Sequence, residues 1–420
     1  MLKTVLTALR SADLRKKLLF TAFILAIFRF GSCVPVPGVD TEALEAAIQN
    51  RGSTLLDFLN LFAGGALTRF AVFALGIMPY ITASIILQLM TVVIPSLEKL
   101  QKEGESGQQK ITQYTRYLTV GLAFFQSFAY VLYFQSQDAL PGLDVQSFYL
   151  IVVSLTAGTT LVMWLGELIT QRGVGNGISL LIFASIVAAV PTALEGWWGL
   201  EPVSQVIIGL VALGVVVGVV FVNEGQRRIP IQYAKRVVGR RMTSGGTTYM
   251  PLRVNMAGVI PVIFATSVVI LPATFAELGG RGSFFQDISD FLAPGSWYYI
   301  IFEGLLIIGF TYFYTAVQFN PVDQADNLKK HGGFIPGVRP GRPTAVYLDR
   351  VLTRLTLPGA IYLAAVAEFP NIAFRYLPES SAFFGVLGGT SILIVVGVAL
   401  DTMRQMEAQL LMRNYEGFLR

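Results

Sequence analysis

Cysteine and histidine are almost absent from this chain. Its 420 residues include one cysteine, Cys33, and one histidine, His331. Within the chain itself, these counts exclude a disulfide framework, a zinc site of cysteine and histidine ligands and a histidine-based catalytic triad. The sequence also lacks a G-x-x-x-x-G-K-[ST] phosphate-binding loop. We therefore expect no catalytic residue, cofactor or metal site, and any energy from nucleotide must come from a partner.

Charged residues are scarce as well, at 14% of the chain against 54% hydrophobic residues. A soluble fold of this length cannot hide so much apolar surface. The run from Val206 to Val222 is apolar on every side, which favours helices over β-barrel strands. The sequence predicts an all-α polytopic membrane protein with ten spans, at about 18–37, 71–95, 117–135, 148–170, 178–193, 203–222, 254–276, 297–319, 352–371 and 381–400.

The distribution of positive charge predicts the orientation of these spans. If both termini are cytoplasmic, the inner side holds 26 of the 31 Lys and Arg residues. The exceptions are Arg51, Arg69, Arg281 and Arg375 outside, with Arg29 inside the first span. Because positive charge accumulates on the cytoplasmic side of membrane proteins, this topology is the one we expect.

Two spans contain the same kind of helix breaker, Gly76 to Pro79 in one and Gly258 to Pro261 in the other. A proline inside a membrane helix removes a backbone hydrogen bond, which is tolerated where protein or a water-lined cavity satisfies the freed carbonyl. Paired interruptions are typical of inverted repeats around a central pathway. We expect a substrate to pass between these two segments.

Two long cytoplasmic loops, 223–253 and 320–350, are rich in basic residues. The first begins with alternating β-branched residues and contains a Gly-Gly turn, which predicts a protruding hairpin. In the second, Pro336 and Pro340 stiffen a turn that presents Arg339 at its tip. Such loops can serve only to fix topology and touch anionic lipid, or they can dock a large partner. Their length favours the partner.

The segment from Thr54 to Leu67 is apolar on one face and too short to span a bilayer. It fits a re-entrant half-helix or an interfacial amphipathic helix, and the pattern alone favours the interfacial helix. Gly64 and Gly65 would allow the segment to move.

Five strings of residues resemble the bacterial SecY family, whose members form the channel subunit of the Sec protein translocase. The likeness extends from the first span to the end of the chain. The strings are Phe73 to Ile81, Lys102 to Gly107, Gly175 to Ser179, Val254 to Pro261 and Ala325 to Lys330.

The resemblance implies two pseudo-symmetric halves, 1–193 and 203–400, around an hourglass pore, followed by a cytoplasmic tail, 401–420. It identifies 54–67 as a plug, against the preference stated above, with plug residues Leu55, Leu56, Phe58, Leu59, Phe62, Gly64 and Gly65. It also implies a pore ring of Ile77, Ile81, Ile178, Ile182, Ile263 and Ile394. Without the family, isoleucines in membrane spans would be assigned to lipid contact or core packing.

The family further implies a lateral gate that includes Pro79, Gln88, Gln126, Asn255 and Pro261. Ordinary hydrogen bonding between helices is the alternative for the three amides. Two charged residues lie in the spans, Arg29 and Glu167, and membrane charges of this kind are more typical of structural or interfacial positions. We expect almost no other ionisable residue in the spans.

By resemblance, the function is a protein-conducting channel in the bacterial plasma membrane, which passes secretory chains across and membrane helices sideways. The implied partners are SecE, SecG, the motor ATPase SecA, the ribosome with its RNA, signal peptides, nascent chains and anionic lipids. Partner binding is expected at Arg227, Arg228, Lys235, Arg236, Arg240, Arg241, Lys329, Lys330 and Arg339. A secondary transporter is the alternative, because inverted repeats and broken helices also build transporters.

Overall fold

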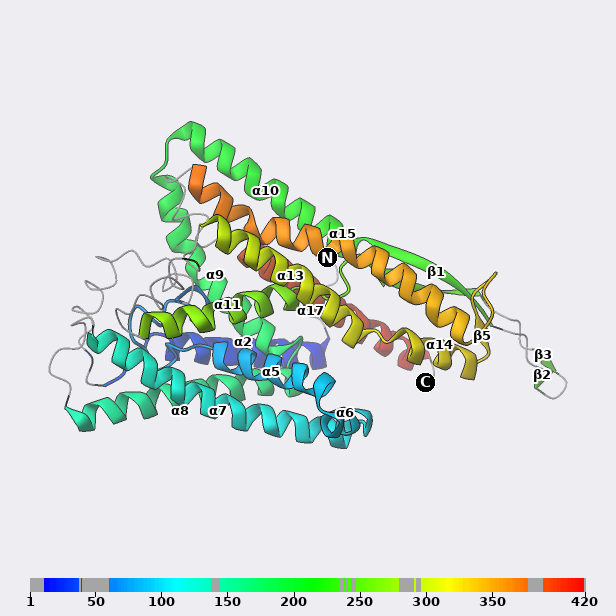
Figure 1. The fold of residues 1–420 in the computed structure, drawn as a ribbon, viewed down its shortest axis with the longest axis horizontal. Coiled ribbons are helices and arrows are strands. Elements are labelled where there is room, and N and C mark those ends of the chain that lie inside the picture. The colour runs from blue at the N-terminus through cyan, green and yellow to red at the C-terminus, as the bar shows by residue number, and fades with distance from the viewer. Residues whose placement is uncertain are drawn as a thin grey trace.

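A computed structural model of the protein describes residues 11–37, 39, 60–136, 144–233, 237–238, 241–242, 247–278, 291, 296–376 and 388–418. Its main body is a bundle of long helices, and a small β-sheet projects from one end (Figure 1). Each predicted span overlaps one helix, which confirms the all-α polytopic fold. These helices are α2 (Ala12–Gly31), α5 (Met78–Val93), α7 (Glu105–Ser136), α8 (Val145–Arg172), α9 (Gly177–Trp198), α10 (Pro202–Glu224), α11 (Ile260–Leu278), α13 (Trp297–Gln318), α15 (Arg342–Tyr376) and α17 (Gly389–Phe418).

Apolar length alone identifies fewer spans than the fold contains. Within the described residues, α7, α8, α9, α10, α13 and α15 are long and apolar enough to cross a membrane. Helix α5 is long and apolar enough only when it is taken together with α6 (Pro95–Lys102), and the two helices are bent by 100° relative to each other. In α2, by contrast, Arg15, Lys16 and Lys17 crowd the first turns. The apolar window of α10 is only 11% buried in the protein, so most of this helix is exposed on the surface of the chain.

The paired helix breakers start helices rather than interrupt them, which corrects the sequence-based prediction. Gly76 and Gly258 both have positive φ angles, 56° and 65°, a conformation that glycine adopts without strain. Pro79 is the second residue of α5, and Pro261 is the second residue of α11. A proline in the first turn costs no hydrogen bond, because the N–H groups there have no partner within the helix.

The predicted hairpin is present and is larger than expected. Strand β1 (Gln226–Tyr233) pairs antiparallel with β4 (Thr247–Arg253), and two short strands, β2 (Val237–Val238) and β3 (Arg241–Met242), pair beyond it. A fifth strand, β5 (Gly333–Phe334), comes from the second basic loop and pairs with the other edge of β1. Helix α14 (Pro321–Lys330) precedes β5. We call β1, β4, β5 and α14 the polar platform.

The platform is attached to the helical bundle by a small apolar core of its own. Ile229 and Leu252 of the sheet and Ile335 after β5 are buried together with Leu348 and Leu352 of α15. The two basic loops and the start of α15 therefore form one packed unit.

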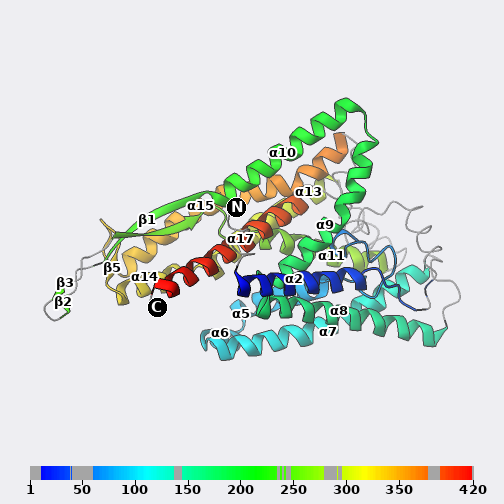
Figure 2. The ribbon, with the colours of Figure 1, turned by 180° about the vertical axis from the view of Figure 1, so that it is seen from behind.

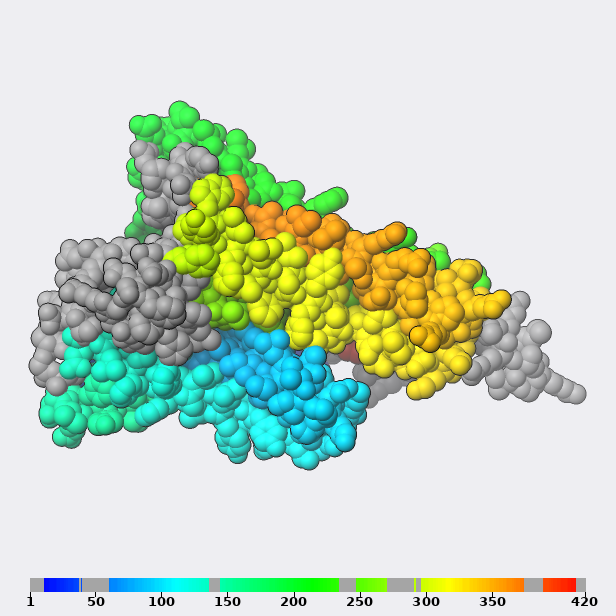
Figure 3. Space-filling model, viewed as in Figure 1, coloured from blue at the N-terminus to red at the C-terminus, as the bar shows by residue number. Residues whose placement is uncertain are grey.

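The two halves of the chain meet along two separate contacts. On one side, α11 of the second half packs against α5 and α7 of the first. Seen from behind, α17 lies against α9 (Figure 2). The halves are also joined through the short turn at 199–201 between α9 and α10. In the space-filling view, the first half is blue to cyan and much of the second is yellow to orange (Figure 3).

Glycine permits close approach where α8 meets the segment before α5. A Cβ added to Gly158 in α8 would clash with the carbonyl oxygen of Val72, whereas one added to Gly214 in α10 would meet nothing. We predict that Gly158→Ala destabilises the protein by about 1–3 kcal/mol, seen as a lower Tm of the purified protein. Gly214→Ala is the matched control and should be neutral or slightly stabilising, because alanine favours helix. Equal Tm values for the two variants would contradict this packing.

Candidate functional site

The six predicted ring isoleucines come from four helical elements and lie in one apolar cluster. Ile77 precedes α5 and Ile81 lies in its first turn, while Ile178 and Ile182 belong to α9. Ile263 of α11 and Ile394 of α17 come from the second half. Five of the six are at most 9% exposed, and Ile178 packs against them from a half-buried position. We call these six residues the constriction.

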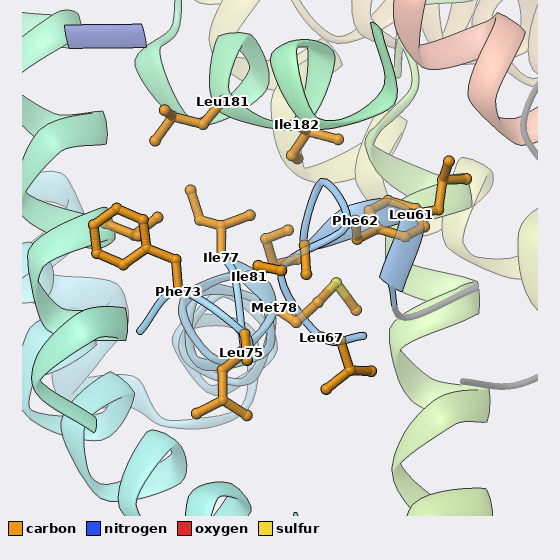
Figure 4. Packing of buried hydrophobic residues seen from close by; sticks show 14 of the residues in the cluster. Leu61, Phe62, Leu67, Phe73, Leu75, Ile77, Met78, Ile81, Leu181 and Ile182 are labelled. Carbon is orange, nitrogen blue, oxygen red and sulfur yellow. The ribbon is translucent and has the colours of Figure 1, made fainter. Parts of the chain in front are cut away.

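Side chains of the constriction from α9 and from the start of α5 lie close together within this cluster. Figure 4 shows Ile182 pointing from α9 toward the segment that carries Ile77 and Ile81. In α9 the two isoleucines are four residues apart, so they lie on one face of the helix. The fold thus gathers stiff, β-branched side chains from both halves into one buried cluster.

Residues 60–77, which we call the hinge segment, fill the space beside the constriction. Leu61, Phe62 and Leu67 belong to the same buried cluster, and Phe62 is 2% exposed. Among the predicted plug residues, Phe62, Gly64 and Gly65 lie in this segment, and both glycines have positive φ angles. Leu55, Leu56, Phe58 and Leu59 lie outside the described residues. After a helical end at 60–62, the described part of the plug consists of turns rather than helix.

The backbone of the hinge segment is held by polar contacts to its own side chains and to α2. The Asn60 Oδ1 atom accepts hydrogen bonds from the backbone N–H groups of Leu67 and Thr68, each at 3.2 Å. The Arg29 guanidinium donates through Nη1 to the Gly64 carbonyl oxygen at 2.5 Å. These hydrogen bonds satisfy backbone N–H and C=O groups that make no helical hydrogen bonds. They support the expected structural position of Arg29.

The predicted gate residues belong to α5, α7 and α11 or to the turn before α11. Gln88 of α5 and Gln126 of α7 are half-buried, and in the described part of the chain their side chains form no hydrogen bond. Asn255 is buried, and its Nδ2 donates to Asn223 Oδ1 at 3.1 Å and to the Gly258 carbonyl at 3.0 Å. Asn255 therefore joins the turn before α11 to the end of α10, within one half of the chain.

A partly exposed ion pair connects two helices of the first half. Arg116 of α7 donates to Glu167 of α8 through Nε at 2.8 Å and through Nη2 at 2.6 Å. This bidentate geometry is the strongest form of a carboxylate contact. The predicted structural position of Glu167 agrees with this pairing.

The basic residues assigned to partner binding lie on the polar platform or beyond it. Arg227 and Arg228 are exposed on β1, and Lys329 and Lys330 are exposed at the end of α14. Arg339 is exposed in the turn before α15, where Gly337 and Gly341 have positive φ angles and the Thr344 hydroxyl donates to the Arg339 carbonyl at 2.8 Å. Arg241 belongs to β3, and Lys235, Arg236 and Arg240 lie outside the described residues.

Sequence reasoning missed two groups of residues that the fold brings together. Arg404 of α17 donates through Nη2 to the Asn223 carbonyl at 3.1 Å and to Glu224 at 2.8 Å, at the base of the hairpin. Glu303 of α13 and Glu368 of α15 are buried inside the bundle, at 3% and 5% exposure. The expectation that the spans hold almost no ionisable residue besides Arg29 and Glu167 was therefore wrong. A glutamate within each of the predicted spans 297–319 and 352–371 could have indicated these acids from the sequence.

Together, these features define a polytopic helical membrane protein with one large buried apolar cluster beside the non-helical residues 63–77. A model of the SecY family matches residues 71–403. Curated relatives named "Protein translocase subunit SecY" are 49% identical in Streptomyces scabiei and Mycobacterium tuberculosis and 48% identical in Corynebacterium glutamicum, each over 100% of both chains. The chain belongs to the SecY family.

Solved structures share the fold at low sequence identity. One titled "The structure of a protein conducting channel" has a TM-score of 0.66 at 18% identity and covers 93% of this chain and 91% of its own. Another, titled "Sec61 in the Canine ribosome-channel complex from the endoplasmic reticulum", has a TM-score of 0.62 at 17% identity with the same coverage.

The contact of Arg29 with Gly64 generates a prediction about the hinge segment. Arg29→Met keeps the length of the side chain and removes its donors, so the Gly64 carbonyl loses its partner and residues 60–70 should open more often. We expect faster amide hydrogen exchange in these residues. The control is Arg69→Met, because Arg69 is exposed and its side chain contacts only the Cys33 sulfur within the described residues. Unchanged exchange in Arg29→Met would show that the contact does not hold the segment.

Proposed function

We propose that the protein is a protein-conducting channel that passes unfolded secretory chains across a membrane. The observation that carries this proposal is the constriction, in which five isoleucines from both halves are buried in one cluster and a sixth, Ile178, packs against that cluster. The names of the relatives in the SecY family agree with it. An apolar constriction offers an ion no replacement for its hydration shell and excludes water by dewetting. Branched aliphatic side chains can still surround an extended polypeptide of any sequence.

In this proposal, residues 54–67, which include the first part of the hinge segment, form the plug. It occupies the constriction at rest and moves aside when a chain enters. The described bonds to Asn60 and Arg29 are few, and hydrogen bonds typically contribute only about 1 kcal/mol each to stability. A translocating chain can therefore displace the plug by offering modest compensating contacts.

The contact of α11 with α5 and α7 is the proposed lateral gate, through which membrane helices leave the channel. Gln88 and Gln126 leave polar groups at this contact without a described hydrogen bond, so an entering signal sequence can supply one. Pro79 and Pro261 start the two gate helices. Asn255 acts differently from the expected interhelical bond, since it fixes the turn that precedes α11.

The polar platform is the proposed docking site for energy-supplying partners, with both termini on the same cytoplasmic side of a bacterial plasma membrane. The SecA motor ATPase and the ribosome are the partners expected there, because carboxylate and phosphate groups pair well with arginine. Two of the related structures carry titles that name the ribosome. SecE, SecG and anionic lipids are further expected partners. The chain itself has no expected nucleotide site.

A secondary transporter is the alternative function, and the buried Glu303 and Glu368 give it one supporting observation. The two proposals differ in their substrate. Uptake of a labelled small solute driven by an ion gradient would favour the transporter. Crosslinks from a stalled secretory chain to a probe at Ile81 would favour the channel.

The seal provides a direct test of the constriction. We predict that replacing all six isoleucines with glycine makes the resting channel conduct ions in a planar bilayer, because the apolar barrier is lost while the helices remain. The matched control replaces the same six residues with leucine, which keeps the apolar volume and should retain the seal. Equal conductance of the glycine and leucine variants would argue against this assignment of the constriction.

Arg339 provides the test of the platform. We predict that Arg339→Glu abolishes translocation driven by the motor and ATP while leaving ion conductance at rest unchanged, because the residue lies in a stiff exposed turn far from the constriction. Arg342→Glu makes the same change of charge three residues away, on another exposed side chain, and should retain most of the activity. Normal translocation by Arg339→Glu would leave this loop with a topological role only.

A further inference from the structure

Two carboxylic acids meet inside the second half of the helical bundle, away from the constriction. Glu303 of α13 is 3% exposed and Glu368 of α15 is 5% exposed. The two carboxyl groups interact with each other, and Glu303 also interacts with the Tyr299 side chain. Helices α13 and α15 pack along their lengths, so the two acids lie at a contact between helices rather than on a free surface.

The pair lies within the apolar part of the bundle. Glu303 follows the start of α13 at Trp297 by six residues, or about 9 Å along the helix. Trp297 and Tyr298 are exposed there, as is typical of residues at a membrane interface. Glu368 lies eight residues before the end of α15, near the same end of the bundle because the two helices are antiparallel. This end points away from the polar platform (Figure 1).

The hydrogen-bond donors at the pair are fewer than its acceptor oxygens. The Asn371 side chain donates to Glu368 Oε2 at 2.9 Å. The Glu368 Oε1 atom is buried and receives no hydrogen bond. An ionised carboxylate has acceptors only, so two ionised acids cannot bond to each other. A contact between two carboxyl groups is satisfied when one of them is protonated.

The surroundings supply no counter-charge among the described residues. Tyr299 is the other titratable group that interacts with the two acids. The described side chains of α11, at 260–269, are apolar except for Thr266 and Ser267, and the first charged residue of α17 is Asp401, near the other end of the bundle. Two adjacent negative charges without a cation are strongly unfavourable in an apolar interior.

We propose that Glu303 and Glu368 form a proton-binding site within the membrane, in which one proton is shared between the two carboxyl groups and joins α13 to α15. The ligand is the proton, and Glu368 Oε1 is the atom left without a donor unless the proton is present. On release of the proton, both acids carry charge and the contact between the helices weakens. The second half of the channel then loses stability as the pH rises, and regains it when the pH falls.

Infrared spectroscopy of the purified full chain in lipid nanodiscs tests the site directly. We expect the wild-type protein at neutral pH to show the carbonyl band of a protonated carboxylic acid. The double variant Glu303→Gln and Glu368→Gln keeps the side-chain shapes and should lose that band. The control Glu201→Gln should retain it, because Glu201 is exposed and caps no helix through its side chain. Absence of the band from the wild type, or its persistence in the double variant, would overturn the proposal.

Thermal unfolding of the same variants provides an independent measurement. The Tm of the wild type should fall as the pH is raised above neutrality, and this fall should be smaller in the double glutamine variant. A wild-type Tm that is independent of pH in this range would overturn the linkage. A Tm that rises with sodium concentration at fixed pH in the wild type, but not in the double variant, would replace the shared proton with a bound cation.

Discussion

Backbone hydrogen bonding inside an apolar solvent is the constraint on which this structure depends. Helices satisfy their own peptide groups, and irregular segments within a membrane need partners from the protein. The hinge segment is irregular and buried, and it obtains those partners from Asn60, from Arg29 and from the strand-like residues 34–36. The Val36 N–H donates to the Phe70 carbonyl, and the Val72 N–H donates to the Val34 carbonyl. A non-helical segment is thus possible at this depth, because neighbouring residues supply the hydrogen bonds that a helix would make within itself.

The same constraint explains why two prolines occur near the centre of the molecule. Pro79 and Pro261 each follow a glycine with positive φ and begin a helix, so neither removes a hydrogen bond that the helix could make. The ends of α5 and α11 therefore lie inside the protein rather than at its surface. Their side chains, Ile81 and Ile263, reach the constriction from these internal ends, and a channel lined by helix ends can widen without bending a continuous helix.

Much of the fold was predictable because membrane spans are recorded in the sequence as long apolar runs. The hairpin was predictable from alternating residues and a glycine turn. Helix α14 and strand β5 were not, because the first is short and polar and the second depends on pairing with β1 from a loop about 100 residues earlier. The constriction required a family resemblance, since nothing in periodicity separates Ile77 or Ile394 from an isoleucine that faces lipid. The bond of Asn255 to Asn223, within one half, could be seen only in three dimensions.

Strand β5 has a mechanical consequence for the platform. Because it pairs with β1, the turn that carries Arg339 and the hairpin that carries Arg227 cannot be pushed independently. At the base of the hairpin, Asp401 lies 3.8 Å from Arg253, and Arg404 reaches Glu224, so α17 is fastened to the same sheet. Ile394 precedes Arg404 by ten residues, or about 15 Å of rigid helix. The bonds of Arg404 to the Asn223 carbonyl and to Glu224 therefore connect a displacement of the sheet to α17, the helix that carries Ile394.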